Sequence, residues 1–472
     1  MSTLGTTNVR YATDYNLKSL NLITSLQGGI INLMPMMIEL NLFEDLYSST
    51  ISGEIVVQDA LGIISAFNLN GNEFLQVQLQ KTTSDNYYYS RNFRVYKVGR
   101  RVTGDSNQYE VFTLMFCSEE FMLSEQYRIS KSFKGQQIST IVGRIMNDYL
   151  KVGTGSTKPV YIEPTKGNYD FILPNKKIFE TINWLATYSQ TKNSVGDMVF
   201  FESVNGYYFV SLTSLFKGQV YANYKFDPKN ITTDMNQQVL NVSDFEVLNF
   251  YDTLAATKNG TFTNKVITLN VLQRKKDSSN GIFDYSNYLT NETTLNPNPV
   301  INNYRNRFGA TLYDIPPVNI PGLESGCLRM ATGNKEDKKN PGIISRNAVD
   351  SVANDIMIEK YLPNRVGQMA LANYTRIKVT IPGDPNISVG KVINFSTYKI
   401  EPKTYSQGGS NAQREVDPFY SGKYIVTAVR HIVKNNSYIT VIEMCKDSNT
   451  GKLSGFPYGS SVVKNFVNGV QV

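Results

Sequence analysis

Few residues in this sequence could carry catalysis, and their spacing does not suit it. The obvious acid pairs are Glu44-Asp45 and Glu119-Glu120. A glycosidase needs two carboxyl groups at a matched separation across the substrate, one of them with a raised pKa. Because adjacent residues on a strand point to opposite faces, neither pair meets this requirement. We therefore interpret both pairs as solvated or turn positions.

A single histidine, His431, further restricts the possible chemistry. Most zinc sites, and every Ser-His-Asp triad not built on this residue, are excluded. His431 follows Arg430 in a segment that is predicted to be a strand, where a lone histidine is usually structural. We therefore predict that it is a structural residue and not a catalytic base.

The other possible signatures of chemistry are absent from the sequence. Cys117, Cys327 and Cys445 are odd in number and far apart, which indicates neither a disulfide framework nor a metal site. Residues 382–390, PGDPNISVG, lack the spacing of a phosphate-binding loop, so we expect a turn between strands. We predict no catalytic, cofactor-binding or metal-binding residue, no cofactor, and no enzymatic activity.

The composition predicts a large, sheet-rich protein with several domains. At 472 residues the chain exceeds what one core usually holds. Its 30 tyrosines and 24 phenylalanines favour sheets, because aromatic side chains pack well on a pleated surface. The net charge of +7 is modest and the basic residues are scattered, so we expect no specific DNA binding. No signal peptide is predicted, and the most apolar stretch, residues 22–40, is too broken for a membrane span.

Hydrophobic patterns predict a β-rich first region and a mixed region after it. Residues 30–120 are predicted to form strands around one short helix with Asp59 as its N-cap. Within this region, residues 93–102 and 109–116 flank turn residues and predict a hairpin.

Helical spacing of apolar residues then predicts helices at 136–150 and 175–190. The second contains the only tryptophan, Trp184, which we interpret as a packing residue of a helix on a sheet. Asn205-Gly206 between aromatic runs predicts a tight hairpin turn. Two helices and a hairpin together predict a compact α+β module.

The last part of the chain is predicted to return to β structure after an interruption. Residues 274–345 are rich in Asn, Ser and Pro, which is typical of a long loop or an inserted subdomain. Residues 347–362 predict an amphipathic helix that ends at Pro363. Residues 423–433 and 438–444 predict a final hairpin.

One element of the sequence occurs twice. Leu40–Val57 and Leu248–Ile267 both begin Leu-Asn, continue with two hydrophobic residues and an acid, and then reach a leucine, Leu46 or Leu254. A glycine follows in each, once a single residue is skipped in the alignment. The repetition predicts an internal duplication of a β unit. We therefore expect Leu46 and Leu254 to be buried at equivalent positions.

The predicted fold class is α+β and mainly β, with two similar β units in one chain. The predicted domains are a first β domain at 1–129, an α+β module at 130–239, a second β domain at 240–273 and 346–450, an inserted loop-rich subdomain at 274–345 and a C-terminal tail at 451–472.

Four stretches of this sequence resemble the central hub proteins of contractile-tail bacteriophage baseplates. They are residues 40–79, residues 171–190 followed by 200–215, residues 364–393, and residues 417–447. The resemblance implies that the two β domains, 1–129 and 240–273 with 346–450, are similar tail-tube-type β-barrel domains. Residues 274–345 match no known part of that family.

The resemblance implies a structural role in the virion tail baseplate, after assembly in the host cytoplasm. Three copies of a chain with two tube-like barrels would form a ring of pseudo-six-fold symmetry around a channel for DNA. Such a homotrimer would adapt the hexameric tail tube to the trimeric central spike. The implied partners are the spike, tube or tube-initiator proteins and baseplate wedge proteins, with DNA only as passing cargo and no membrane insertion by this chain.

Two other functions stay open from the sequence alone. One is a receptor-binding or adhesin-like tail protein, and the other is a cell-wall-degrading tail enzyme. The sequence shows no segment that would carry cell-wall cleavage, so the resemblance implies that any such activity belongs to a partner.

Overall fold

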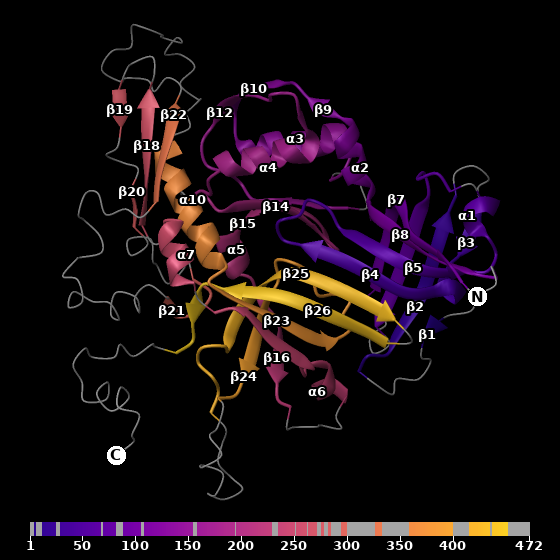
Figure 1. Cartoon of the computed structure of the whole chain (residues 1–472). Helices are drawn as coiled ribbons and strands as arrows, with labels where there is room; N and C mark the ends of the chain where they lie inside the picture. The colour runs from indigo at the N-terminus through magenta and orange to yellow at the C-terminus, as the bar shows by residue number, and fades with distance from the viewer. Residues whose placement is uncertain are drawn as a thin grey trace, which may run out of the picture.

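The computed structural model describes the chain except for a set of segments and single residues. These are 1–3, 6–11, 25–28, 68, 82–87, 105–107, 154–157, 194, 229–234, 251, 262, 271–274, 278–281, 285–293, 300–325, 333–357, 400–414, 435–436 and 452–472. Strands dominate, and one sheet of 14 strands runs through most of the molecule (Figure 1). The mainly β, α+β class predicted from the sequence is confirmed.

The first half of this sheet is an antiparallel set that we call the first β unit. Its hydrogen-bonded order is β1-β2-β6-β7-β8-β5-β4, with β3 also paired to β2. The strands are β1 (Leu4–Gly5), β2 (Tyr15–Ile23), β3 (Ile30–Asn32), β4 (Met37–Asp45), β5 (Ser52–Asp59), β6 (Phe74–Lys81), β7 (Tyr88–Thr103) and β8 (Glu110–Ser118). A 3-10 turn, Met34–Met36, and the short helix α1 (Ile63–Ala66) connect them.

The second half of the sheet, which we call the second β unit, comes mostly from the end of the chain. Its strands are β16 (Val220–Phe226), β17 (Asp244–Asn249), β23 (Thr375–Pro382), β24 (Val392–Thr397), β25 (Gly422–Lys434) and β26 (Ser437–Lys446). The helix α6 (Met235–Val239) precedes β17. Residues 240–243 bond to Lys225 of β16 and to Thr380 of β23, which closes this unit into a ring.

The hairpin β25–β26 belongs to both units. One edge of β25 pairs with β24 at its start and with β4 over the rest of its length. The partner strand β26 donates from the Tyr438 amide to the Thr13 carbonyl, next to β2. The first β unit therefore closes only through the hairpin that the second unit supplies, and we call β25–β26 the shared hairpin.

The α+β module lies between the two units in sequence and packs above them in Figure 1. It contains α2 (Glu119–Gln126), β9 (Arg128–Ile129), β10 (Ser132–Gln136), α3 (Ile138–Leu150), β11 (Val160–Ile162), β12 (Tyr169–Ile172), β13 (Lys176–Lys177), α4 (Ile178–Tyr188), β14 (Met198–Ser203), β15 (Gly206–Ser211) and α5 (Leu212–Phe216). The apolar stripe of α3 is buried in its core, as its helical spacing predicts. Trp184 packs edge-on against Phe171 and Tyr188, which confirms its packing role.

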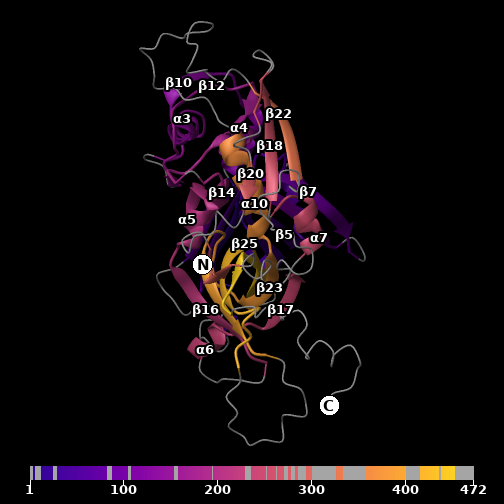
Figure 2. The same ribbon diagram turned by 90° about the vertical axis from the view of Figure 1, so that its left-hand side faces the viewer.

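A separate small sheet contains β18 (Thr263–Asn270), β19 (Lys275–Asp277), β20 (Ile282–Asp284) and β22 (Gly326–Thr332). The helix α10 (Ile358–Ala372) lies between this sheet and α4 (Figure 2). The prediction that the helix ends at Pro363 is wrong, because α10 continues through it. Residues 347–357 of the predicted helix lie outside the described residues.

The segment around Asn296 ties part of the predicted insertion to the second β unit. The short strand β21 (Asn298–Pro299) pairs with β27 (Ser448–Asn449). The Asn296 amide side chain also donates to the carbonyls of Lys423 and Ser448 and accepts from the Lys423 amide. The division of the chain into five parts stays a prediction, but this contact gives residues 294–299 a structural role.

The hairpin predictions in the first 220 residues are confirmed, but the prediction of Asp59 as the N-cap of the short helix is wrong. The N-cap of α1 is Gly62, and the Asp59 carboxylate accepts backbone N–H bonds from Leu61, Gly62 and Ile63 around the start of the helix. The strands β7 and β8 form the predicted hairpin, and β14 and β15 pair around Asn205-Gly206. Gly206 has a φ of +134°, a backbone conformation that favours glycine.

The two copies of the repeated element have different structures. In the first copy, the hairpin β4–β5 follows the pattern, and Leu46 is completely buried in the second unit's core. In the second copy, the helix α7 (Thr253–Lys258) follows the end of β17, and the next strand, β18, belongs to the separate small sheet. Leu254 lies on α7 and is 67% exposed, so the prediction that it is buried is wrong.

This difference predicts opposite effects for two matched substitutions. Leu46→Ala should lower the free energy of unfolding by about 2–5 kcal/mol, because it leaves a cavity in a packed core. Leu254→Ala should change it by less than about 0.5 kcal/mol in the isolated chain, because little is buried. Urea unfolding followed by fluorescence measures both, and similar costs at the two positions would contradict the assignment.

Candidate functional site

The described residues most unusual in their chemistry are polar side chains buried between the cores of the two β units. Along β4, Leu40 and Leu42 belong to the first core, and Leu46, just past the strand, belongs to the second. Glu44 lies between them on the same buried face of the strand. A carboxyl group therefore marks the boundary between two apolar cores.

The shared hairpin repeats this change of core, offset by two residues from Glu44 in the pairing of β25 with β4. In β25, Val433 packs in the first core and Val429 in the second, and His431 lies between them. In β26, Thr440 is the buried polar residue that separates the two cores, and it pairs with His431 across the hairpin. Three adjacent strands thus place the buried polar residues Glu44, His431 and Thr440 near the boundary between the two cores.

Glu44 is 2% exposed, so its predicted interpretation as a solvated or turn position is wrong. Burial raises its pKa to about 8; the nearby charge of Glu202 adds to the shift, and the Val389 amide and Lys391 oppose it. The carboxyl group is therefore mostly protonated at neutral pH. Asp45, its neighbour, is exposed, as alternation along a strand requires.

His431 is completely buried, which agrees with the prediction that it is structural. Its Nδ1 lies 2.8 Å from the Tyr438 hydroxyl, and its ring lies 6.0 Å from that of Tyr89. Burial lowers the pKa of the imidazole to about 4, so the ring is neutral at physiological pH. A neutral ring enclosed by protein cannot reach a substrate in solution.

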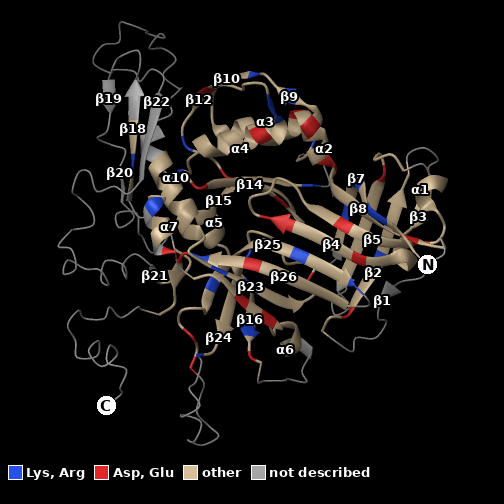
Figure 3. Cartoon of the chain, viewed as in Figure 1, with Lys and Arg blue, Asp and Glu red and all other residues tan. Residues whose placement is uncertain are grey.

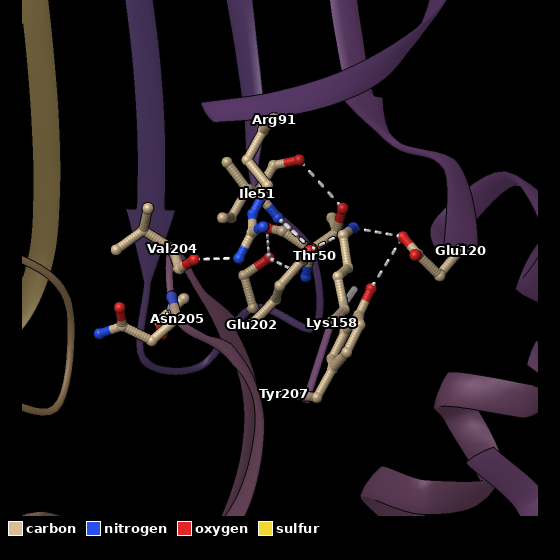
Figure 4. A network of polar contacts seen from close by, with 11 residues as sticks. Thr50, Ile51, Arg91, Glu120, Lys158, Glu202, Val204, Asn205 and Tyr207 are labelled. Atoms are coloured by element: carbon tan, nitrogen blue, oxygen red, sulfur yellow. Dashed lines mark hydrogen bonds and ion pairs between the residues drawn. The ribbon is translucent and has the colours of Figure 1, made fainter. Parts of the chain in front are cut away.

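A second buried group of charges joins the α+β module to the first β unit (Figure 4). The Lys158 ammonium donates to Glu120 at 2.6 Å and to Glu202 at 2.9 Å. The other oxygen of Glu202 accepts from the Ile51 backbone amide at 2.9 Å. Tyr207 donates to Glu120 at 3.3 Å and completes the group. The hairpin β14–β15 is thereby fixed to the start of β5.

The electrostatic balance of this group favours a charged lysine. Burial alone would lower the pKa of Lys158, but the carboxylates of Glu202 and Glu120 more than offset this, and the pKa is raised. Arg91 of β7 adds a further bond across the same contact by donating to the Val204 carbonyl. Removing one partner from a buried ion pair typically costs about 3–5 kcal/mol, because the other charge is left uncompensated.

Glu119 and Glu120 do not lie on a strand, although their interpretation from alternating strand faces assumed that they do. They form the first turn of α2, where the helix dipole favours acids. Glu120 is part of the buried network rather than a solvated residue, so that interpretation is wrong for it. No local sequence pattern indicates this network, because Lys158 lies far along the chain from Glu120 and Glu202.

Three further features of the described part of the chain bear on its function, namely clusters of metal ligands, pockets and membrane-spanning helices. Among the described residues, no three His, Cys, Asp or Glu side chains lie together as metal ligands. A pocket of about 170 Å³ lies elsewhere, in the α+β module, between Glu163, Lys192 and Ser214. No helix among the described elements has the length and apolar character needed to cross a membrane. Basic and acidic residues are interspersed over the elements in Figure 3.

Comparison with known proteins identifies one curated relative of nearly full length. The chain is 22% identical over 423 residues to the probable baseplate hub protein of Vibrio phage KVP40, and the match covers 87% of this chain and 89% of the relative. The resemblance to baseplate hub proteins is thereby confirmed. No family model matches the sequence.

Two solved structures of tail proteins are similar to this chain along most of its length. A tail protein from Neisseria meningitidis matches 92% of this chain and 97% of its own length, with a TM-score of 0.48 and 9% identity. The 43 kDa tail protein of prophage MuSo2 from Shewanella oneidensis matches 91% and 98%, with a TM-score of 0.47 and 7% identity.

The raised pKa of Glu44 predicts a pH-dependent stability. The folded chain keeps this proton between about pH 4.5 and pH 8, where the unfolded chain releases it. The stabilisation is fully present below about pH 4.5 and is lost as the pH rises through about 8. Over this range, urea unfolding should show the wild type losing on the order of 3–5 kcal/mol relative to Glu44→Gln.

The matched control is Leu254→Ala, which removes no titratable group. Its difference from the wild type should stay nearly constant over the same pH range. A constant difference for Glu44→Gln as well would show that the buried carboxyl group does not titrate as described.

Proposed function

We propose that this chain is the structural central hub of a phage contractile-tail baseplate. The observation that carries the proposal is the match to a probable baseplate hub protein over most of both chains. The buried polar groups support a structural role, because Glu44, His431 and Lys158 all serve contacts inside the chain.

In this proposal three copies form a ring that adapts a six-fold tail tube to a three-fold spike. A chain with two β units presents two tube-facing surfaces, so three chains present six. This use requires a fixed orientation of the two units within each chain. The shared hairpin supports that requirement, because β25 is hydrogen-bonded to strands of both units.

The proposed neighbours are the central spike, the tube or its initiator, and baseplate wedge proteins. The ring would leave a channel through which DNA passes as cargo, and the chain would reside in the virion after assembly in the host cytoplasm. We further propose that the chain is not an enzyme and has no catalytic, cofactor-binding or metal-binding residue. Any cell-wall cleavage by the tail would then belong to a partner.

The oligomeric state tests the ring directly. Light scattering on a size-exclusion peak should give three times the chain mass of 53.1 kDa, at high concentration or with the spike partner. A dimer or hexamer that persists at every concentration, with and without the spike, would contradict the proposal.

Incubation with purified peptidoglycan tests the absence of activity. The purified chain should release no soluble fragments, while a lysozyme sample releases them under the same conditions. Release that disappears in Glu44→Gln or Glu119→Gln would show that these acids are catalytic and that the chain is a cell-wall-degrading enzyme.

A further inference from the structure

The outer part of the β7–β8 hairpin exposes apolar side chains on both faces. Beyond Val95, each described residue of β7 is exposed or half-buried, although the inner part of the strand is packed in the first core. The exposed apolar residues are Tyr96, Val98, Val102 and Tyr109. Exposed apolar groups gathered on one element are typical of a protein contact. We call residues 96–102 the basic arm.

The basic arm also carries a net positive charge. Lys97, Arg100 and Arg101 lie on it, and only Arg101 forms an ion pair with a described residue, Glu110 at 2.6 Å. Arg100 has a φ of +48°, within a bulge where β7 has extra residues opposite β8. Such bulges redirect side chains away from a regular ladder. Two cations therefore stand on the arm with no acid of the described chain in ion-pair contact.

A surface of opposite charge lies on the second β unit. The sequence from 244 to 254 contains three acids and no base, and of these Glu246 is paired with Lys378. Asp244 and Asp252 are exposed and form no ion pair within the described part of the chain. Val247, Leu248 and Leu254 are exposed beside them. We call Asp244, Val247, Leu248, Asp252 and Leu254 the acidic surface.

We propose that the basic arm of one copy docks on the acidic surface of the next copy in the trimer. This inference rests on the proposed function, since it names the contact that would close the ring. A ring of identical chains needs two different and complementary surfaces on each chain. The arm and the surface each combine exposed apolar side chains with two charges that form no ion pair in the described part of the chain, and the charges are of opposite sign.

The positions of the two surfaces suit a head-to-tail contact. Figure 1 places β7 and α7 at opposite ends of the molecule. Among the described strands β17 pairs only with β23, and the residues just before it close the second β unit against β16. Exposed apolar residues gathered on one surface are typical of a protein contact. Docking would cover Leu254, whose exposure has no use in the isolated chain.

Two apolar-to-charged substitutions test the contact without disturbing the core. Val102→Asp on the arm and Leu254→Lys on the surface replace side chains that are 64% and 67% exposed, so the isolated chain should fold normally, and each adds a charge of the same sign as the facing surface. Leu61→Asp is the matched control, because Leu61 is 75% exposed and lies on neither surface. Sedimentation over a range of concentrations should show trimer formation weakened about tenfold or more by the first two and unchanged by the control.

A charge exchange gives a second and independent readout. Arg100→Glu and Asp244→Arg should each weaken the trimer, and the double variant should recover part of the loss because the opposite charges are restored between copies. Circular dichroism should show the same fold for every variant. If the wild type is trimeric and none of the four substitutions weakens it, the docking contact is wrong although the hub proposal stands. If the wild type forms no trimer at all, with or without the spike, both proposals fail.

Discussion

Hydrogen bonds along β25 hold the rest of this structure in place. One edge of the strand pairs first with β24 and then with β4, and its other edge pairs with β26. The first β unit thereby closes against a strand that also belongs to the second. Because the two units share backbone bonds, neither can rotate without breaking a continuous ladder. A single hairpin thus gives rigidity to two cores that are separate in their side-chain packing.

The cost of this arrangement appears in the layer where the cores meet. Glu44, His431 and Thr440 are buried there, although an apolar layer of the same size would be easier to desolvate. These groups also fix the strand register, because a one-residue slip would turn each of them into the opposite face. The Lys158 network fixes the position of the α+β module on the first β unit, because its bonds form only when Glu120, Glu202 and Ile51 lie close together.

Sequence patterns predicted the local elements well and the long-range contacts poorly. The α3 stripe, the Asn205-Gly206 turn and the final hairpin depend on neighbouring residues, so their periodicity was sufficient. Glu44 was misjudged although its alternation with Leu40 and Leu42 placed it on a buried face. The exposure of Leu254 could not be predicted from the repeated element, because the two copies have different structures. The first copy forms a hairpin, and the second forms a surface helix. The pairing of β4 with β25 joins residues almost 400 positions apart, which no local pattern reports.

The shared hairpin has a consequence for how the chain is made. A ribosome completes β8 more than 300 residues before it completes β26, which at roughly 5–20 residues per second is a delay of about 15–60 s. During that time β2 and β4 have no hairpin between them, and the nascent first unit has two open edges. Contacts so distant in sequence also slow folding after release, because long loops must close first. Production of this protein therefore depends on protection of an unfinished sheet, by chaperones or by low temperature, until the last strands emerge.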